Sequence, residues 1–343
     1  MWWCRFKIMS RMNTSASRRD FLQQAGTVVG SALALGANAV QPTEAAALQG
    51  QTSAASGTAS RARRLRLLLQ RSALLVAPEA YSVIAGKLAE AHGFDAIYIG
   101  GNMMSMTYLG VPDWGIITTP EMVDIAGRIA REVAIPAIVD ADQAGETSLN
   151  VYRTVQLYER AGIAGLHIED SRNPKKMETW AGPGGPTTTE LQPIEQMRER
   201  LQAAVDARMD RDFVIIGRTV AEDPAAVIRR GVAFAEAGAD LVMNSLTGMT
   251  AEQINRIARE IPVPLLGIGV PKTHLAGTQM KVNIHPNIVS SPAVALCDDI
   301  FRELRENGEV SSRRPLAPET LARITGANTY SELAKQWLTT PSR

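Results

Sequence analysis

Cysteine, aromatic residues and an excess of charge of either sign are all scarce in this chain of 343 residues. The two cysteines, Cys4 and Cys297, are too few for a disulfide-built scaffold or a cysteine-rich zinc or iron–sulfur site. Lys and Arg total 36 against 35 Asp and Glu, a net charge of +1, which argues against a nucleic-acid binder that relies on a basic surface. Hydrophobic residues make up 45% of the chain and charged residues 21%, as in a globular protein.

The amino terminus has the composition of an export signal. Residues 1–19 carry five basic side chains and no acidic one, and the pair Arg18-Arg19 precedes Asp20-Phe21-Leu22. The mildly apolar run at 25–39 is shorter than the roughly 20 residues that span a bilayer. This arrangement resembles the twin-arginine export signal, which is read by a receptor and does not anchor the protein.

We therefore predict a twin-arginine signal peptide over residues 1–47 and an Ala/Ser/Thr/Gly-rich linker over 48–64. The mature protein is expected to be periplasmic and to have no membrane anchor. The alternative is a cytoplasmic protein whose amino terminus is not a functional signal.

From about residue 72, short apolar runs alternate eight times with amphipathic stretches. Strict alternation favours a parallel sheet, and eight units in about 250 residues favour a closed (β/α)8 TIM barrel over an open sheet. No Gly-x-Gly-x-x-Gly motif opens the first helix, which argues against a dinucleotide-binding fold. We predict an α/β barrel over 65–310 and a helical extension over 311–343. The expected strands are 73–77, 96–100, 137–142, 165–169, 213–218, 241–244, 265–269 and 288–290.

Carboxylates stand at the ends of several expected strands. Asp140 and Asp142 end the third strand, Glu169 ends the fourth, and Asp113 lies in the segment after the second. Arg218 ends the fifth. The carboxyl ends of barrel strands form the active-site mouth, where several carboxylates repel one another unless a cation is present. Oxygen ligands with few His or Cys residues nearby favour Mg²⁺, or Mn²⁺, with several waters retained.

These motifs, taken in order, resemble the isocitrate lyase/phosphoenolpyruvate mutase superfamily. The resemblance covers about residues 65–310 and includes AIYIGG at 96–101, LGVPD at 109–113, DAD at 140–142, ERAGIAGLHIED at 159–170 and FVIIGRT at 213–219. It implies a (β/α)8 barrel whose eighth helix is swapped between subunits of a homodimer or homotetramer. It also implies that Mg²⁺ holds a small 2-oxo or 2-hydroxy acid and stabilises an enolate.

The resemblance implies roles for individual residues as well. Asp140 would bind Mg²⁺ directly, and Asp142, Glu169 and Asp113 would bind it mostly through water. Arg218 would grip a substrate carboxylate and the developing oxyanion, a task that suits the bidentate guanidinium.

Further residues would bind the substrate or act on it. The backbone of Gly100, Gly101 and Asn102 matches the place where amides bind a substrate carboxylate. Asp113 would also line the substrate site, and Asn244 stands where the lyases place a carboxylate. Lys175 would be catalytic, on the long Gly- and Pro-rich loop over 171–190.

Departures from the family pattern narrow the expected chemistry. The loop reads Lys175-Lys176-Met177-Glu178-Thr179 where the isocitrate and methylisocitrate lyases have Lys-Arg-Cys-Gly-His. A thioether cannot donate a proton, so Met177 removes that general acid, and Glu178 is a candidate replacement. The phosphonate branches tend to carry Asn in place of Met177.

We therefore expect a Mg²⁺-dependent carbon–carbon lyase or decarboxylase that acts on a small 2-oxo or 2-hydroxy dicarboxylic acid, similar to oxaloacetate decarboxylase. Two alternatives remain. One is a phosphorus–carbon bond enzyme of the mutase type, and the other is an exported carboxylate-binding protein without turnover.

The export signal can be tested with a reporter fused to residues 1–50. Replacing Arg18-Arg19 by Lys-Lys should abolish export, because the twin-arginine receptor reads the arginine pair. The measurement is reporter activity in the periplasmic fraction, with the unchanged fusion as control. Export that survives the replacement would contradict the prediction.

Overall fold

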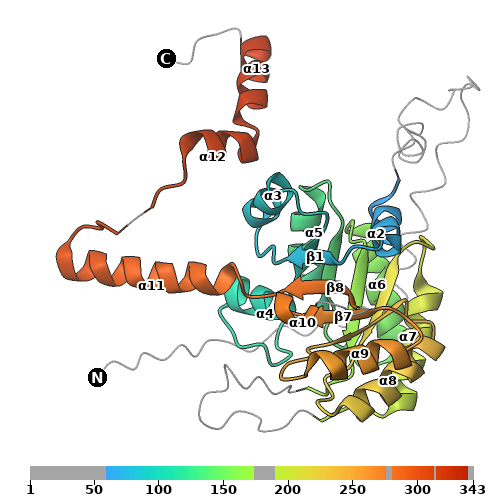
Figure 1. The fold of residues 1–343 in the computed structure, drawn as a ribbon. Helices are drawn as coiled ribbons and strands as arrows, with labels where there is room; N and C mark the ends of the chain where they lie inside the picture. Colours follow the sequence, from blue (N-terminus) through green and yellow to red (C-terminus); the bar gives the residue numbers. More distant parts are fainter. Residues whose placement is uncertain (1–58, 174–189, 276–279, 313, 339–343) are drawn as a thin grey trace, which may run out of the picture. The chain divides into compact units, whose positions relative to one another are not determined.

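The computed structural model describes residues 59–173, 190–275, 280–312 and 314–338 (Figure 1). The chain divides into two units, Met1–Gly57 and Thr58–Arg343, and all described residues belong to the second. The expected signal peptide lies outside them. Helix α2 (Arg61–Gln70) begins inside the stretch expected to be linker, where the Ser60 hydroxyl caps the Arg63 N–H.

Eight parallel strands form the barrel and pair in the order β1-β8-β7-β6-β5-β4-β3-β2. A bridge between Glu79 and Tyr98 joins the two ends of this order, so that the ring is nearly closed. This confirms the (β/α)8 prediction. The strands are β1 Leu75–Pro78, β2 Ile97–Ile99, β3 Ala137–Asp140, β4 Gly165–Glu169, β5 Val214–Arg218, β6 Leu241–Asn244, β7 Leu265–Ile268 and β8 Met280–His285.

The eighth strand was expected at 288–290, and that expectation is wrong. The strand is Met280–His285, where residues buried in the barrel alternate with others along the chain. Ile288 and Val289 are exposed and lead into helix α11 instead. A short apolar run was mistaken for a strand because it has no alternation of its own to mark it.

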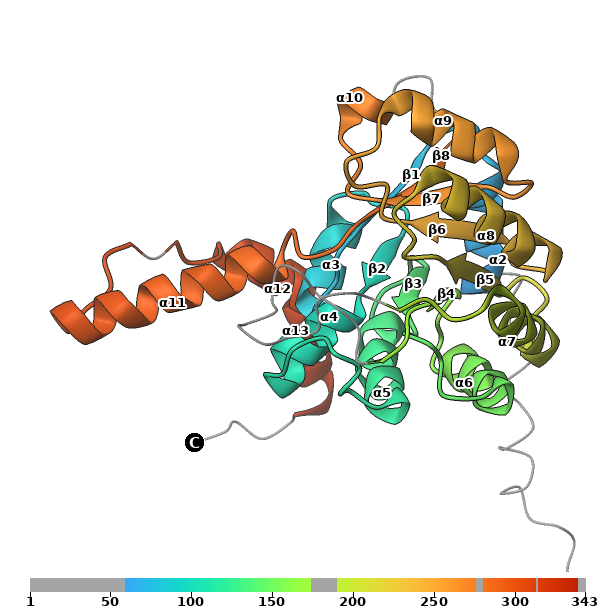
Figure 2. The same ribbon diagram turned by 90° about the horizontal axis from the view of Figure 1, so that it is seen from below.

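Helices surround the ring of strands (Figure 2). Several of them are capped at their start by a side chain, as at Asp223, whose carboxylate accepts the Ala226 N–H before Pro224 opens α8. The helices between strands are α3 Val83–Ala91, α4 Gly101–Met104 with the π-helix η1 Ser105–Leu109, α5 Thr119–Arg131, α6 Ser148–Arg160, α7 Ile194–Ala207, α8 Pro224–Glu236, α9 Ala251–Glu260 and α10 Lys272–Leu275.

Alternate strand residues build two apolar layers. One fills the barrel interior with residues such as Ile138, Ile216 and Met243, together with Leu65 from α2. The other lies between strands and helices and contains Phe234 and Tyr158. This two-residue alternation decides which side chains at the strand ends face the mouth of the barrel.

Among the described residues, three helices follow the last strand: α11 Ser290–Asn307, α12 Pro318–Thr325 and α13 Ala327–Trp337. Helix α11 runs away from the barrel (Figure 1), and of its residues only Ser290 is buried. Its start is held by Glu79, whose carboxylate accepts the N–H groups of Val289 and Ser290 and the Ser290 hydroxyl at 2.7–3.0 Å. Exchange of this helix between subunits stays a prediction.

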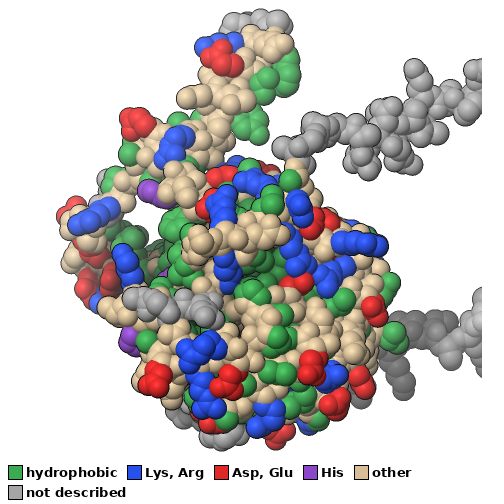
Figure 3. All heavy atoms as spheres, turned by 45° about the vertical axis from the view of Figure 1, so that its right-hand side comes forward, with side chains coloured by type: hydrophobic (Ala, Val, Ile, Leu, Met, Phe, Trp, Pro, Cys, Tyr) green, Lys and Arg blue, Asp and Glu red, His purple; other side chains and the backbone are tan. Residues whose placement is uncertain are grey.

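The surface carries no face of a single charge in the view of Figure 3, where basic and acidic side chains are interspersed. Within the described ranges, no helix is long and apolar enough to cross a bilayer.

The helix–strand layer can be tested at Phe234, which is fully buried on α8. Phe234→Ala should lower the free energy of unfolding by about 3–5 kcal/mol, because it leaves a cavity in a packed layer. Arg229→Ala, an exposed position on the same helix, should change it by no more than about 0.5 kcal/mol. Urea denaturation measures both, and equal effects would contradict the layer assignment.

Candidate active site

The inward-facing residues at the carboxyl ends of β2 to β5 converge at the barrel mouth. Asp140 pairs in register with His167 across β3 and β4, and Glu169 pairs with Arg218 across β4 and β5. Tyr98 on β2 faces the same interior. The structure thus brings together Asp140, Glu169 and Arg218, the central residues of the predicted site.

Arg218 lies against the carboxylates. Its Nη1 is 2.8 Å from Glu169 Oε2 and 3.8 Å from Asp140 Oδ2. Burial alone would lower the pKa of Arg218, but the charges of Glu169 and Asp140 raise it above its ordinary value. The guanidinium is therefore a permanent cation, and at 21% exposure it can still reach a ligand.

Asp140 and Asp142 face the first turn of α4. Gly101 N–H donates to Asp140 Oδ2 at 3.1 Å, and Asp142 N–H donates to Asp140 Oδ1 at 2.9 Å. A Cβ added at Gly101 would lie 3.0 Å from Asp140 Oδ2 and 3.5 Å from Asp142 Oδ1. A larger residue here would crowd the Asp140 carboxylate and shift it by a few tenths of an ångström.

The remaining predicted residues lie apart from one another. Asp113 is buried between η1 and α5, and its charge helps to raise the pKa of Arg218. The backbone of Asn102 lies in α4, next to Gly101. Its side-chain Nδ2 donates to Asn287 Oδ1 at 3.2 Å. Lys175 lies outside the described residues.

Asn244 faces the helices. Its Nδ2 donates to the carbonyls of Thr219 and Ala221, and its Oδ1 accepts the Leu246 N–H. It has the same parity on β6 as Val242, which belongs to the layer between strands and helices. Both amide hydrogens thus bind the main chain, and a contact with substrate stays a prediction.

Two residues at the centre of the site, Tyr98 and His167, were not among the predicted site residues. Tyr98 Oη lies 2.9 Å from His167 Nε2, and His167 Nδ1 lies 3.6 Å from Asp140 Oδ1. The two rings stack with centroids 5.9 Å apart. The sequence indicates the position of His167, because residues two apart on a strand lie on the same face and His167 therefore faces inward as Glu169 does.

The other half of the mouth is apolar. The inward-facing residues on β6, β7 and β8 include Met243, Ile268 and Ile284. The mouth therefore has a charged half, from β2 to β5, and an apolar half, from β6 to β8. A polar substituent of a ligand is better accommodated on the charged side.

The charged half fits a divalent cation. Four buried carboxylates, those of Asp113, Asp140, Asp142 and Glu169, share this region with the guanidinium of Arg218, and like charges of this density favour a bound cation. In the part of the chain that is described, no group of three or more His, Cys, Asp or Glu side chains is placed so that it could hold a metal ion, so an ion here would be held largely through water. Mg²⁺ suits such a site because it retains several waters.

Sequence comparison finds one matching family and several similar enzymes. A family described as phosphoenolpyruvate phosphomutase matches residues 65–283. The 2,3-dimethylmalate lyase of Eubacterium barkeri is 38% identical over 205 residues, which are 59% of this chain and 68% of that protein. The oxaloacetate decarboxylase of Rhodopseudomonas palustris (strain HaA2) is 33% identical over 285 residues, 80% of this chain and 95% of that protein.

Solved structures of two enzymes have the same fold as this chain. Phosphonopyruvate hydrolase in complex with oxalate and Mg²⁺ superposes with a TM-score of 0.71 at 26% identity and covers 82% of this chain and 100% of its own. Oxaloacetate acetylhydrolase in complex with 3,3-difluorooxalacetate superposes with a TM-score of 0.72 at 26% identity and covers 82% and 99%.

The ion pair at the mouth can be tested by its removal. Arg218→Met should lower the free energy of unfolding by about 3–5 kcal/mol, because it leaves buried carboxylates without their cation. The control is Arg172→Met, which breaks an exposed pair with Glu190 at 4.0 Å and should cost less than about 1 kcal/mol. Chemical denaturation at neutral pH measures both, and a loss no larger than the control's would count against a buried pair.

Proposed function

Because this chain belongs to the phosphoenolpyruvate mutase/isocitrate lyase superfamily, we propose that it is a Mg²⁺-dependent carbon–carbon lyase or decarboxylase. Its substrate is a small 2-oxo or 2-hydroxy dicarboxylic acid, and oxaloacetate decarboxylation is the nearest example. The observation that carries the proposal is the contact of Arg218 with Glu169 and Asp140 at the barrel mouth.

The metal would be held by the chain's own carboxylates. Asp140 would be the direct ligand, and Asp142, Glu169 and Asp113 would hold the waters of the ion. When bound, Mg²⁺ supplies a Lewis acid that polarises the 2-oxo group and stabilises negative charge on its oxygen. The Mn²⁺ ion has similar ligand preferences and is the alternative.

Arg218 and the backbone at 100–102 would orient the substrate head. The guanidinium donates to the carboxylate and to the oxygen on which charge develops, where its raised pKa keeps it protonated throughout. In decarboxylation, the electron pair of the breaking C–C bond passes into the 2-oxo group, CO₂ leaves, and the enolate is then protonated. Bond breaking itself needs no general acid, which suits a chain with Met177 where the lyases have Cys. We propose Lys175 as the catalytic loop residue and Glu178 as a candidate proton donor.

The apolar half of the mouth favours a small substrate over a tricarboxylate. Met243, Ile268 and Ile284 offer no partner for an extra carboxylate, and such a group would be desolvated without compensation. They can accept a methyl group instead, and a lyase named for a dimethylated malate is among the relatives.

Two other functions remain as outcomes of the test. A phosphorus–carbon bond enzyme is favoured by the structural similarity to phosphonopyruvate hydrolase, and an exported carboxylate-binding protein would keep the metal site without turnover. With the arginine pair at 18–19, we propose that the enzyme acts in the periplasm.

The proposal is tested by assaying purified protein on oxaloacetate, 2-methylmalate, 2,3-dimethylmalate and phosphonopyruvate. We expect turnover of oxaloacetate or of one of the two malates in the presence of Mg²⁺, and loss of this turnover when EDTA is added. Turnover of phosphonopyruvate alone would favour the phosphorus–carbon alternative. Tight oxalate binding without any turnover would favour the binding protein.

A matched pair of variants tests whether Asp140 is the direct metal ligand. Asp140→Asn should reduce turnover at least 100-fold, because the direct Mg²⁺ ligand loses its charge. Asp95→Asn, an exposed aspartate that pairs with Arg71, should leave turnover unchanged. An active Asp140→Asn enzyme would contradict the ligand assignment.

A further inference from the structure

An arginine stands on the buried face of helix α7. The buried residues in the middle of this helix are spaced three and four apart, and they are Met197, Arg200, Leu201 and Ala204. Residues with this spacing share one face of a helix, and three of the four are apolar. Arg200 is nevertheless only 4% exposed, and burial lowers the pKa of its guanidinium. A buried cation on such a face requires polar partners close by.

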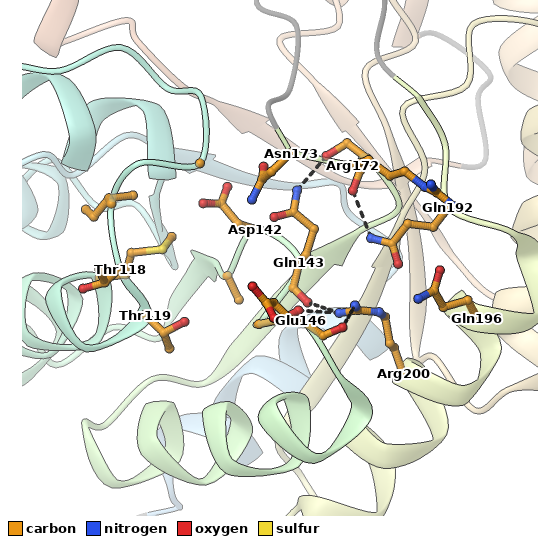
Figure 4. Close-up of a pocket in the computed structure, with 16 residues that line it drawn as sticks. Thr118, Thr119, Asp142, Gln143, Glu146, Arg172, Asn173, Gln192, Gln196 and Arg200 are labelled. Carbon is orange, nitrogen blue, oxygen red and sulfur yellow. Dashed lines mark hydrogen bonds between the residues drawn. The ribbon is translucent and has the colours of Figure 1, made fainter.

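The partners of Arg200 are main-chain carbonyls of the loop that follows β3. Its Nη1 donates to the carbonyls of Gln143 and Gly145 at 2.8 and 2.6 Å, and its Nη2 donates to that of Glu146. Figure 4 shows these bonds between α7 and the loop. Carbonyl oxygens that point at one place repel one another, and the guanidinium offsets this repulsion with several donors in a fixed planar arrangement. The arginine therefore stabilises the turn in which these carbonyls converge.

The same loop has a strained backbone. Asp142 and Ala144 have positive φ angles of 48° and 57°, and this left-handed conformation is unfavourable for alanine in particular. Ala144 is buried, and its carbonyl accepts the Thr154 hydroxyl at 3.0 Å. Gly145 has a φ of 106°, and a Cβ added there would lie 2.4 Å from the Asn150 Cβ. Contacts with neighbouring elements thus maintain a conformation that the loop alone would not favour.

This loop supports two carboxylates of the proposed metal site. The Asp142 N–H donates to Asp140 Oδ1 at 2.9 Å, and the Asp142 carbonyl accepts the Glu169 N–H at 2.8 Å. Gln143 Nε2 donates to the Ser171 hydroxyl at 2.8 Å, and that hydroxyl donates to Glu169 Oε1 at 2.5 Å. A change in the turn would therefore move the Asp142 carboxylate and weaken the support of the Glu169 carboxylate.

We propose that Arg200 is a positioning residue for the metal site, because its guanidinium holds the loop after β3 in the conformation that presents Asp142 and Gln143 to that site. It acts through the main chain of the loop, and this role requires no contact with substrate or metal. The inference rests on the proposed function, since it takes a divalent ion to be bound at Asp140. Side chains that orient metal ligands from behind contribute to the affinity for the metal.

The positioning role is tested by the affinity of the full chain for Mn²⁺, measured from the electron paramagnetic resonance signal of the free ion. Arg200→Met removes all donors and should weaken Mn²⁺ binding about 10–100-fold. Arg200→Lys keeps a charge on a single nitrogen and should weaken it about threefold or more, but less than Arg200→Met does. The lysine variant provides the test if the methionine variant fails to fold.

Arg208 provides a matched control at the other end of the same helix. Its Nη1 lies 2.9 Å from Asp240 Oδ2, and its side chain is 13% exposed. Arg208→Met should destabilise the protein but leave the affinity for Mn²⁺ within about twofold of the unchanged chain, because distant sites act independently. An equal loss of Mn²⁺ affinity in Arg208→Met and Arg200→Met would indicate a general effect of destabilisation and would overturn the inference.

A second substitution tests the strained turn itself. Glycine adopts a positive φ without the steric penalty that alanine carries. Ala144→Gly in the Arg200→Met chain should therefore restore the affinity for Mn²⁺ by about threefold or more. Absence of any recovery would contradict the proposal that Arg200 acts by holding this turn.

The outcomes separate this inference from the proposed function. Unchanged affinity for Mn²⁺ in both Arg200→Met and Arg200→Lys would overturn the positioning role alone. Failure of the unchanged chain to bind either Mn²⁺ or Mg²⁺ would overturn the proposed function itself.

Discussion

The contact between Arg218 and Glu169 at 2.8 Å is the interaction on which the site depends. It joins two neighbouring strands at the level where the barrel opens, and it offsets part of the repulsion among four buried carboxylates. Asp140 lies within 3.8 Å of the same guanidinium nitrogen and is oriented by two backbone N–H groups. The four carboxylates therefore create a region of negative potential beside the positive guanidinium. The negative region suits a metal ion, and the guanidinium suits a carboxylate bound next to that ion.

Much of this arrangement could be predicted from the sequence, because parallel strands place their carboxyl ends at one edge. The acidic residues that follow apolar runs mark that edge, and Asp140, Glu169 and Arg218 meet there. The prediction was less accurate where it depended on which face of the sheet a strand residue occupies. Asn244 ends a strand as Glu169 does, yet it faces the helices, since its position along β6 matches Val242 and not Met243.

Other features depend on contacts that a sequence does not show. The Tyr98–His167 pair forms between strands whose residues are 69 positions apart, and nothing local to either residue indicates its partner. The contact of Arg200 with the carbonyls after β3 is visible only once the loop around it is placed. The last strand was misplaced because a short apolar run before a helix resembles a strand in composition.

The start of α11 is held at two points, by the Glu79 carboxylate and by Asn287, whose Oδ1 accepts from Asn102. Asn287 has a positive φ of 61°, a conformation that few residues other than Gly, Asn and Asp adopt readily. The direction in which this long helix leaves the barrel is thus geometrically tied to the turn that begins α4. During evolution, a change in the direction of α11 would therefore shift Asn102 and the start of α4 as well, so that the two helices would tend to change together.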